Sequence, residues 1–417
     1  MVDTDALQRS FGLVARHGDE VPLYFYSHLF LRYPQTRPMF PAAMSAQRDR
    51  LVGALVRVVS NVHQVQTVVP YLQQLARDHR KYGVTDDHYP MVGAALLATL
   101  EHFLGEEWTP ELAADWTAAY GVIASVMTEA SAEASGTAPA WYDAEVVDHE
   151  SRGPGVAVLT VRPDRRVEYR AGQSLSVQTP AAPRIWRYFS PANAPRADDT
   201  LEFHVRAVDG GWVSPNLVAR TGKGDILRLG APVGEGLHVP SSQTARPVLM
   251  LAGGTGLAPL RAIVEELARQ QDDAGPGHVP RPVGLFVGAR TEQELYDLPY
   301  LRRLEAQLSW LDVVPVVARA AHLTSTARTG HVAEVALHAA VAAARASGSA
   351  EPPEIYVCGS DQMVAGCLEV LAQGGIDTRE VRRELYGYER HTTIGTLDVP
   401  EEAPHQQQDP VESEARA

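Results

Sequence analysis

The stretch 248-VLMLAGGTGLAP-259 joins a short apolar run, a glycine-rich turn and the start of an amphipathic pattern. The run is short and bounded by turn residues, which indicates a strand buried on both faces. Leu260, Ile263, Val264 and Leu267 then follow at helical spacing. Such a turn lets the backbone approach a pyrophosphate, and the helix start favours its negative charge. The turn lacks the GxGxxG spacing, so a plain tight turn explains this segment alone equally well.

More buried-strand patterns follow, separated by helical or loop sequence. They are 283-VGLFV-287, 313-VVPVV-317 and 355-IYVC-358. Apolar strands alternating with helices predict a parallel sheet covered on both faces. We therefore expect an α/β domain over residues 244–395. Residues 396–417 are poor in apolar side chains, which predicts a disordered acidic tail.

The preceding segment has the period of antiparallel strands. In 201-LEFHVRAV-208, apolar side chains alternate with Glu202, His204 and Arg206, as in a half-buried strand. Similar patterns occupy 155-GVAVLTV-161 and 172-GQSLSV-177. These patterns predict a small β-barrel over residues 141–243.

Residues 1–134 carry helical patterns instead. Apolar side chains hold one helical face at Leu7, Phe11 and Val14, between Leu51 and Val62, at Leu96, Leu97 and Leu100, and over 112–127. The proline-rich 33-YPQTRPMFP-41 predicts a corner. Small residues over 130–140 suit a flexible linker, which we place at 135–140. The expected fold is multidomain: an all-α domain, an antiparallel β-barrel and an α/β parallel-sheet domain.

Composition limits the class of function. The 417-residue chain has a formal net charge of −14 and no basic block, so nucleic acid and anionic membranes are poor partners. Two cysteines, Cys358 and Cys367, predict neither a disulfide framework nor a cysteine metal site. The N-terminus MVDTDALQRS does not read as a signal peptide, and no apolar run approaches bilayer length. We expect a cytoplasmic protein without a membrane span.

Five segments of the barrel and the α/β domain form a longer pattern. They are 186-WRYFSPAN-193, 210-GGWVS-214, 252-AGGTGLAP-259, 355-IYVCGSDQM-363 and 384-ELYGY-388. In this order and spacing they resemble the ferredoxin–NADP reductase superfamily over about residues 141–395. The resemblance implies a barrel that binds FAD, followed by an α/β domain that binds NADH or NADPH.

The resemblance also implies roles for the matching residues. Arg187 pairs with the FAD pyrophosphate, since a guanidinium suits phosphate oxygens, and Ser190 hydrogen-bonds the flavin edge. Phosphate donors are implied at Gly211, Val213 and Ser214, and nicotinamide-cofactor contacts at Gly254, Thr255, Gly256, Leu257, Ala258 and Pro259. Cys358 and Gly359 are implied beside the nicotinamide ring, Tyr386 over the flavin and Glu384 nearby. By itself, a buried cysteine ending a strand is more often a packing residue.

The reductase pattern has departures. Phe189 occupies a position where the family has tyrosine, so one hydroxyl contact to FAD is missing. Tyr188 does not replace it, because adjacent strand residues point to opposite faces. Ser174 stands where many relatives place a tyrosine, which predicts weaker FAD binding. Arg290 in 288-GARTEQELYDL-298 could accept a 2′-phosphate, but the acidic continuation favours NADH.

The octet 77-RDHRKYGV-84 contains a histidine that, by itself, reads as a solvated side chain. Its companions change that interpretation. They are Tyr26 in 24-YFYSHLF-30, Phe40 in the proline-rich corner, Gln47 at a helix start and Tyr89 in 88-HYPMVGAALLATL-100. Together with His79 they resemble the globin domain of flavohaemoglobins over nearly all of residues 1–134.

This second resemblance implies that His79 is the proximal ligand of a haem b iron, for which neutral imidazole is a standard donor. Phe40 packs against the porphyrin, and Tyr26 points its hydroxyl at bound dioxygen. Gln47 and Leu51 complete the distal pocket. Plain core packing explains Phe40 and Leu51 equally well, and Tyr26 has the alternative of a backbone hydrogen bond.

The proximal side departs from the best-known flavohaemoglobins. In those proteins a glutamate on the last helix bonds the histidine and makes it more electron-donating. Here the expected position holds Ser131, flanked by Glu129 and Glu133 on other faces of the helix. Tyr89 keeps its place, while Asp78 replaces the usual lysine.

The family activity implied is nitric oxide dioxygenase, with electrons passing from NAD(P)H through FAD to haem and with O₂ and nitric oxide as substrates. Two alternatives stay open because of Ser131. The chain could reduce another oxidant or a peroxide, or the globin could bind gas and regulate the reductase. We expect a monomer or weak dimer.

Overall fold

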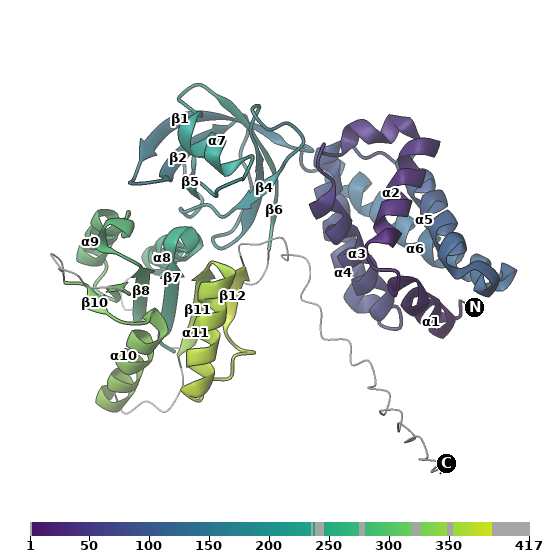
Figure 1. The fold of residues 1–417 in the computed structure, drawn as a ribbon. Coiled ribbons are helices and arrows are strands. Elements are labelled where there is room, and N and C mark those ends of the chain that lie inside the picture. The colour runs from purple at the N-terminus through teal and green to yellow at the C-terminus, as the bar shows by residue number, and fades with distance from the viewer. Residues whose placement is uncertain are drawn as a thin grey trace, which may run out of the picture.

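The computed structural model describes residues 2–234, 237, 246–274, 280–318, 326–347 and 353–385. Figure 1 shows three parts in chain order: a bundle of helices, an antiparallel sheet and a parallel sheet with helices on both faces. This is the fold class predicted from the sequence. Tyr386 and the tail 396–417 lie outside the described residues.

The N-terminal part is entirely helical in its described residues. Its α-helices are α1 (Thr4–Ala15), α2 (Glu20–Arg32), α3 (Ser45–Ser60), α4 (Val65–His79), α5 (His88–Leu104) and α6 (Pro110–Ser135). Short 3₁₀ helices are η1 (Pro34–Met39), η2 (Arg80–Tyr82) and η3 (Gly105–Glu107). The proline-rich corner is η1. Helix α6 includes residues 130–135, so these small residues are helical and not flexible as their composition had suggested.

The helices enclose their own core because each turns one apolar face inward. Leu7 and Val14 of α1 pack with Leu29 of α2 and Leu100 of α5. The indole Nε1 of Trp116 donates to a buried serine hydroxyl 3.1 Å away, which satisfies a polar group inside this core.

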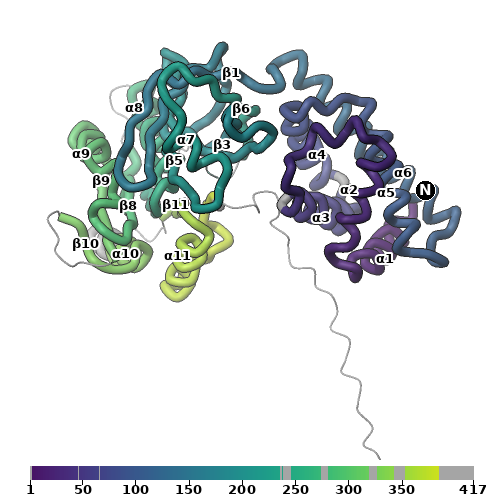
Figure 2. The backbone as a smooth tube through the Cα atoms, turned by 45° about the horizontal axis from the view of Figure 1, so that its top comes forward, coloured from purple at the N-terminus to yellow at the C-terminus, as the bar shows by residue number. Residues whose placement is uncertain are grey.

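The middle part is a six-stranded antiparallel sheet in the order β4-β3-β6-β1-β2-β5. Its elements are β1 (Tyr142–Ser151), β2 (Val156–Pro163), β3 (Ser174–Gln178), β4 (Arg187–Phe189), β5 (Leu201–Arg206), α7 (Ser214–Ala219) and β6 (Ile226–Val233). Figure 2 places β3 and β6 on the side of this sheet that faces α4. The helical domain therefore docks against two neighbouring interior strands of this sheet.

The predicted alternation along β5 needs one correction. Leu201, Phe203 and Val205 enter the core as expected. His204 was expected on the exposed face, but its side chain is buried. The reason is that polar residues of the next domain cover that face, as described below.

The C-terminal part is a six-stranded parallel sheet in the order β10-β9-β8-β7-β11-β12. Its elements are β7 (Val248–Gly253), η4 (Gly254–Gly256), α8 (Leu257–Ala274), β8 (Val283–Ala289), η5 (Glu292–Glu294), α9 (Leu298–Gln307), β9 (Leu311–Val317), β10 (Arg328–Thr329), α10 (Val332–Ser347), β11 (Glu354–Gly359), α11 (Asp361–Gln373) and β12 (Arg382–Leu385). Side chains of α8 and α9 pack on one face, and those of α10 and α11 pack on the other.

The strand order reverses direction between β7 and β11. The first strand of the domain pairs with β8 on one side and with β11 on the other. Ligands of open α/β sheets bind at the carboxyl ends of strands at such a reversal. The glycine turn after β7 and the Cys358–Gly359 pair ending β11 therefore meet at the edge where a ligand is expected.

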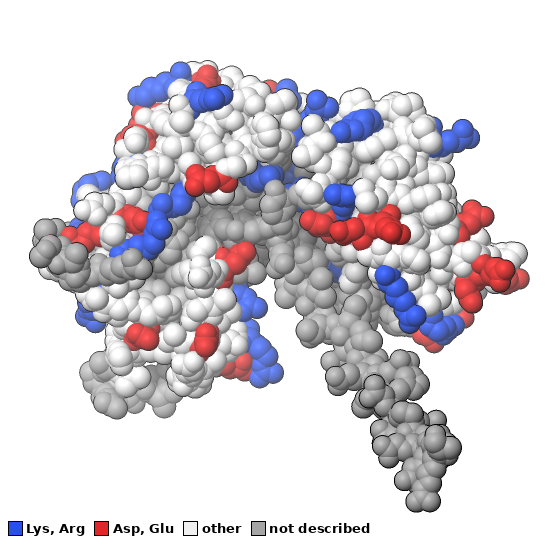
Figure 3. All heavy atoms as spheres, in the orientation of Figure 1, with Lys and Arg blue, Asp and Glu red and all other residues white. Residues whose placement is uncertain are grey.

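The surface charge is mixed, and the described helices can be compared with the length of a membrane span. On the face drawn in Figure 3, acidic and basic side chains are interspersed over all three parts. Across the residues that the structure describes, no helix has the length and apolar character needed to cross a bilayer.

Candidate functional site

His79 is the last residue of α4, and its ring is fixed by the helix itself. Its Nδ1 atom lies 2.7 Å from the backbone oxygen of Leu75. A carbonyl oxygen only accepts, so Nδ1 carries the proton and Nε2 keeps a free lone pair. Burial lowers the pKa of His79 and keeps the ring neutral. A neutral imidazole with a free Nε2 is the donor that haem iron requires, so this residue fits the implied group.

The structure brings three of the predicted distal residues together. The Tyr26 ring meets the Phe40 ring edge to face, with centroids 5.5 Å apart. The Tyr26 hydroxyl donates to the backbone oxygen of Gln47 at 3.3 Å. This contact is the backbone hydrogen bond given above as the alternative role of Tyr26. Burial raises the pKa of Tyr26 to about 12, which keeps the phenol protonated. Leu51 packs against the same core.

A cavity of about 350 Å³ opens beside Tyr26. Phe30 and Met44 provide apolar lining, and Arg37 and Arg48 provide cations. The Arg37 guanidinium is held by carbonyl oxygens, including that of Phe40 at 3.2 Å. Tyr26 is therefore one of the residues that line this pocket.

Tyr89 and Ser131, which were predicted on the proximal side, lie at or next to the cluster between α4 and α6. Tyr89 packs against the cluster between α4 and α6, and its backbone oxygen accepts from the Tyr120 hydroxyl at 2.6 Å. Ser131 follows Ala130, which packs against α4 in that cluster. The described contacts of His79 include its own helix carbonyl and the Tyr82 ring, and among the described residues none joins His79 to a carboxylate by a hydrogen bond.

Two serines and a carboxylate from distant segments lie together, and two of them, Ser190 and Glu384, are among the residues predicted near the flavin edge. The Ser190 hydroxyl donates to Glu384 at 2.8 Å, and the Ser174 hydroxyl donates to the other carboxylate oxygen. The two serine oxygens lie 3.0 Å apart. Since each hydroxyl has one proton, both serine oxygens present only lone pairs to a ligand. Register places Glu384 beside Cys358, so the barrel and the α/β domain share this site.

The other residues predicted to bind FAD lie on β4 and in the segment between β5 and the start of α7. The Arg187 guanidinium donates to the Trp186 oxygen at 2.9 Å, and Phe189 packs partly into the barrel core. Gly211 closes a turn onto the Val208 oxygen, buried Val213 precedes α7, and the Ser214 hydroxyl accepts from the Val208 amide.

The turn after β7 requires glycine for a steric reason. A Cβ on Gly256 would overlap the Cys358 carbonyl, so this backbone-to-backbone approach requires glycine. Gly254 adopts the left-handed region with φ +55°, and the guanidinium of Arg206 lies 3.7 Å from where its Cβ would be. Thr255 lies in η4, and Leu257, Ala258 and Pro259 begin α8. Open backbone beside a cation fits a dinucleotide pyrophosphate.

Arg290 is tied to a carboxylate. Its Nε and Nη2 atoms lie 2.9 Å and 2.5 Å from Glu294 Oε1. The guanidinium is therefore neutralised locally, which removes much of its attraction for a 2′-phosphate.

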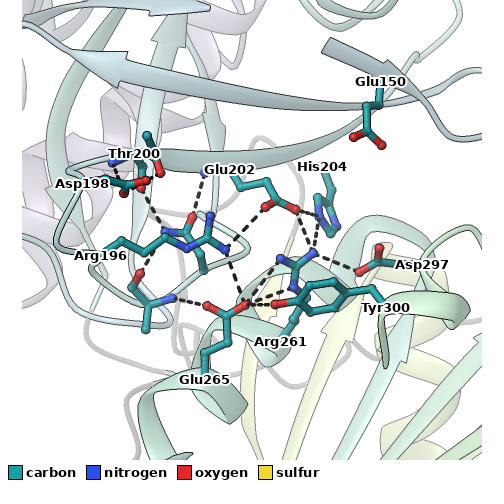
Figure 4. Close-up of polar contacts among 12 residues, drawn as sticks. Glu150, Arg196, Asp198, Thr200, Glu202, His204, Arg261, Glu265, Asp297 and Tyr300 are labelled. Carbon is teal, nitrogen blue, oxygen red and sulfur yellow. Dashed lines mark hydrogen bonds and ion pairs between the residues drawn. The ribbon is translucent and has the colours of Figure 1, made fainter. Parts of the chain in front are cut away.

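A buried polar cluster joins the barrel to the α/β domain (Figure 4). Arg261 of α8 donates to Glu202 of β5 at 2.8 Å and to Asp297 at 3.0 Å. Its guanidinium also stacks 3.7 Å from the Tyr300 ring centroid, and it contacts His204 Nε2 at 3.1 Å. This cluster holds the two halves of the flavin-edge site in one relative position.

Sequence reasoning missed Arg206, Arg261 and the role of Ser174. Arg206 and Ser174 carried a usable signal, because polar side chains at strand ends face a sheet edge. Arg261 carried none, since Glu202 and Asp297 lie 59 and 36 residues away in the sequence.

Three family models match successive parts of the chain. They are Globin over residues 23–127, Oxidoreductase FAD-binding domain over 144–237 and Oxidoreductase NAD-binding domain over 250–369. The chain thus carries domains for haem, FAD and a nicotinamide dinucleotide, the cofactors predicted from the sequence.

Flavohemoproteins are similar along nearly the whole chain. The protein of Bacillus subtilis is 22% identical over 405 residues, covering 92% of this chain and 96% of that protein. The protein of Rhodopirellula baltica is 24% identical over 396 residues, covering 90% and 94%. The solved flavohemoglobin of Malassezia yamatoensis, with bound FAD and heme, has a TM-score of 0.71 at 16% identity and covers 92% and 98%. The chain has the domains of a flavohaemoprotein in the same order.

Proposed function

We propose that this chain, which combines the globin, FAD-binding and NAD-binding domains of the flavohaemoproteins, is a nitric oxide dioxygenase. Electrons pass from a reduced nicotinamide dinucleotide through FAD to haem, and nitric oxide and dioxygen become nitrate. Nitrate has the atoms of one nitric oxide and one dioxygen plus one electron. A hydride carries two electrons and therefore supports two turnovers. NADH is the preferred donor, because Glu294 neutralises Arg290.

The observation that carries the proposal is the His79 ring at the end of α4, which is buried and bonded through Nδ1 to its own helix, so that Nε2 is left for a ligand. Haem, when bound, supplies an iron that holds dioxygen, and FAD splits a hydride into single electrons. His79 offers Nε2 to that iron, and Leu75 holds the ring by its other nitrogen. Tyr26 remains un-ionised near neutral pH, and it would exchange its hydrogen bond to the Gln47 carbonyl for one to dioxygen.

The reductase residues position the other reactants. Ser174, Ser190 and Glu384 hold the flavin edge, and Cys358 ends the neighbouring strand. The Gly254–Gly256 turn receives the dinucleotide backbone. Arg261 keeps the barrel and the α/β domain together, so hydride donor and acceptor stay in register.

The decisive measurement is nitric oxide consumption by the purified, NADH-reduced protein in air, with haem and FAD content determined. We expect consumption coupled to NADH oxidation at one NADH per two nitric oxide molecules. A rate no higher than that of free haem would exclude the dioxygenase function.

A second function is favoured by one observation. The partner of His79 is a backbone carbonyl, a weaker acceptor than a carboxylate, so the histidine donates less electron density to a bound iron. Such a globin suits reversible gas binding that regulates the reductase. In that case, carbon monoxide added to the reduced protein changes the rate of NADH-driven ferricyanide reduction. The dioxygenase alone predicts no change in that rate.

A further inference from the structure

The residues beside the proximal histidine contact the flavin-binding barrel directly. We call this group the proximal contact; it consists of Asp78, Lys81 and Tyr82 of the globin domain and Ser176, Trp186 and Tyr188 of the barrel. Lys81 Nζ lies 2.5 Å from Asp78, 3.0 Å from the Ser176 hydroxyl and 3.1 Å from the Tyr188 hydroxyl. The Tyr188 hydroxyl donates to Asp78 at 2.8 Å, which closes the network.

The barrel is shaped to receive the Lys81 side chain, which is only 1% exposed. A Cβ on Gly230 of β6 would overlap the Ser176 hydroxyl and come within 3.3 Å of Lys81 Cδ. Glycine at this position therefore leaves the space that the lysine stem and the serine occupy. An ordinary surface lysine needs no such slot.

Aromatic rings surround the ammonium group. Lys81 Nζ lies 5.2 Å from the Tyr82 ring centroid, 5.5 Å from that of Trp186 and 4.8 Å from that of Tyr188. These distances are within the range of cation–π attraction. The Tyr82 ring also packs between His79, at 6.2 Å, and Trp186, at 6.4 Å. Ring contacts therefore connect His79 to the barrel through Tyr82.

One barrel residue of the contact, Tyr188, lies on the strand that is predicted to carry flavin-binding residues. Tyr188 lies on β4 between Arg187 and Phe189, and Ser190 follows. Since adjacent strand residues point to opposite faces, Tyr188 turns toward the globin domain while its neighbours turn away. One short strand therefore touches both the flavin position and the segment of His79.

We infer that Lys81, held by Asp78 and Tyr188, is a positioning residue that fixes the proximal segment against β4 and sets the rate of flavin-to-haem electron transfer. The step moves one electron from reduced flavin to ferric haem iron, and the contact residues gain and lose neither electrons nor protons. The inference rests on the electron-transfer part of the proposed function. It also explains why an acidic Asp78 is tolerated beside the ligand, because Lys81 provides the cation from three residues away.

The test uses the full-length, cofactor-loaded protein mixed rapidly with NADH in the absence of air. Lys81→Met keeps the length of the stem and removes the charge, and Tyr188→Phe removes only one oxygen. The matched control is Lys223→Met on the barrel surface, where the ammonium pairs with Asp148 at 2.7 Å and is 68% exposed. Flavin reduction and haem reduction are followed separately by absorbance.

We expect Lys81→Met to slow haem reduction about tenfold or more and Tyr188→Phe about threefold, with flavin reduction unchanged within about twofold. Lys223→Met leaves both rates at the wild-type value. Amide hydrogen exchange over residues 80–82 and 174–178 becomes faster in Lys81→Met, because the segment loses its anchor. The iron–histidine stretching frequency stays constant in Tyr188→Phe, since His79 keeps its bond to Leu75.

The outcomes separate the inference from the proposed function. If Tyr188→Phe and Lys81→Met both reduce haem at the wild-type rate, the inference fails and the dioxygenase proposal stands. If Lys81→Met loses its cofactors, Tyr188→Phe decides, because a phenylalanine fills the same space. A wild-type protein that reduces its haem but does not consume nitric oxide loses the proposed function and keeps the inference.

Discussion

His79 Nδ1 donates to the backbone oxygen of Leu75, 2.7 Å away and one helical turn earlier. The acceptor belongs to the same helix, so the ring orientation is set before any other segment packs against it. A carbonyl oxygen is also a weaker hydrogen-bond acceptor than a carboxylate oxygen. The ligand position is therefore rigid in geometry but modest in its electron donation.

Replacing this histidine tests the ligand assignment. In His79→Ala, we expect the protein to lose its haem absorption band, because no other described contact offers a neutral imidazole in its place. The control is His63→Ala, whose ring bonds to Thr4 at the start of the chain. Haem content per chain and the ferric and ferrous spectra provide the readout. Unchanged spectra in His79→Ala rule out the assignment.

Tyr26→Phe tests the distal hydrogen bond. We expect faster dissociation of dioxygen and about tenfold slower nitric oxide consumption, since one hydrogen bond of roughly 1 to 1.5 kcal/mol is lost. Stopped-flow dissociation kinetics measure the first effect. Equal dissociation rates in the two proteins argue against donation by the phenol.

The same phenol makes a prediction about pH. Its pKa is raised from 10.0 to about 12 by burial. Between these values the unfolded chain releases this proton while the folded protein keeps it, so the free energy of unfolding falls as the pH rises. Denaturant titrations at several pH values should show a steeper loss over this range in wild type than in Tyr26→Phe.

Arg261→Met tests the cluster between the barrel and the α/β domain. Removing the guanidinium takes the buried cation from Glu202 and Asp297 and leaves only the more exposed Arg196 and Arg152 beside them, which should cost about 3 kcal/mol. The control is Arg269→Met on the same helix, where the arginine is 57% exposed and the expected loss is below about 0.5 kcal/mol. Urea unfolding measures both. Similar losses in the two variants contradict a special role for Arg261.

The cluster also predicts acid sensitivity. Burial opposes ionisation of Glu202, but His204 and Arg261 hold its pKa well below the ordinary value of 4.5. The stability that this carboxylate contributes is present above that value and is lost as the pH falls toward the folded-state pKa. In Glu202→Gln the acid-induced part of the loss should be smaller than in wild type.

Glu294→Gln tests the choice of dinucleotide. The amide no longer neutralises Arg290, so we expect NADPH to gain severalfold in kcat/KM while NADH changes little. Glu369→Gln on the exposed face of α11 is the control. If the ratio of the two dinucleotides stays constant, Arg290 does not contact the adenosine ribose.

The fold was predictable because its signals are local. The strand of 248–252 appears as β7 and the helical spacing from Leu260 appears in α8, since both depend on residues next to each other in the sequence. The burial of His204 was not predictable. Alternation describes one strand, and the residues that cover its polar face belong to α8 and the segment before α9.

Part of the candidate site could be proposed from the family pattern. The match named Ser190 and Glu384, and the structure places them 2.8 Å apart although 194 residues separate them. Lys81 had no pattern to follow. Its barrel partner Ser176 is 95 residues further along, and the slot that admits it depends on a glycine in yet another strand.

Arg261 and Lys81, the two buried Lys or Arg side chains among the residues that the structure describes, differ in where their counter-charges reside. Arg261 pairs with Asp297 in its own domain and also with Glu202 of the barrel, so parting those domains would take this cation away from Glu202. Lys81 has Asp78 within its own domain, so undocking of the globin leaves an intact ion pair for water to solvate. A thermal scan should therefore contain fewer transitions than the chain has domains, with the reductase melting as one block and the globin as another.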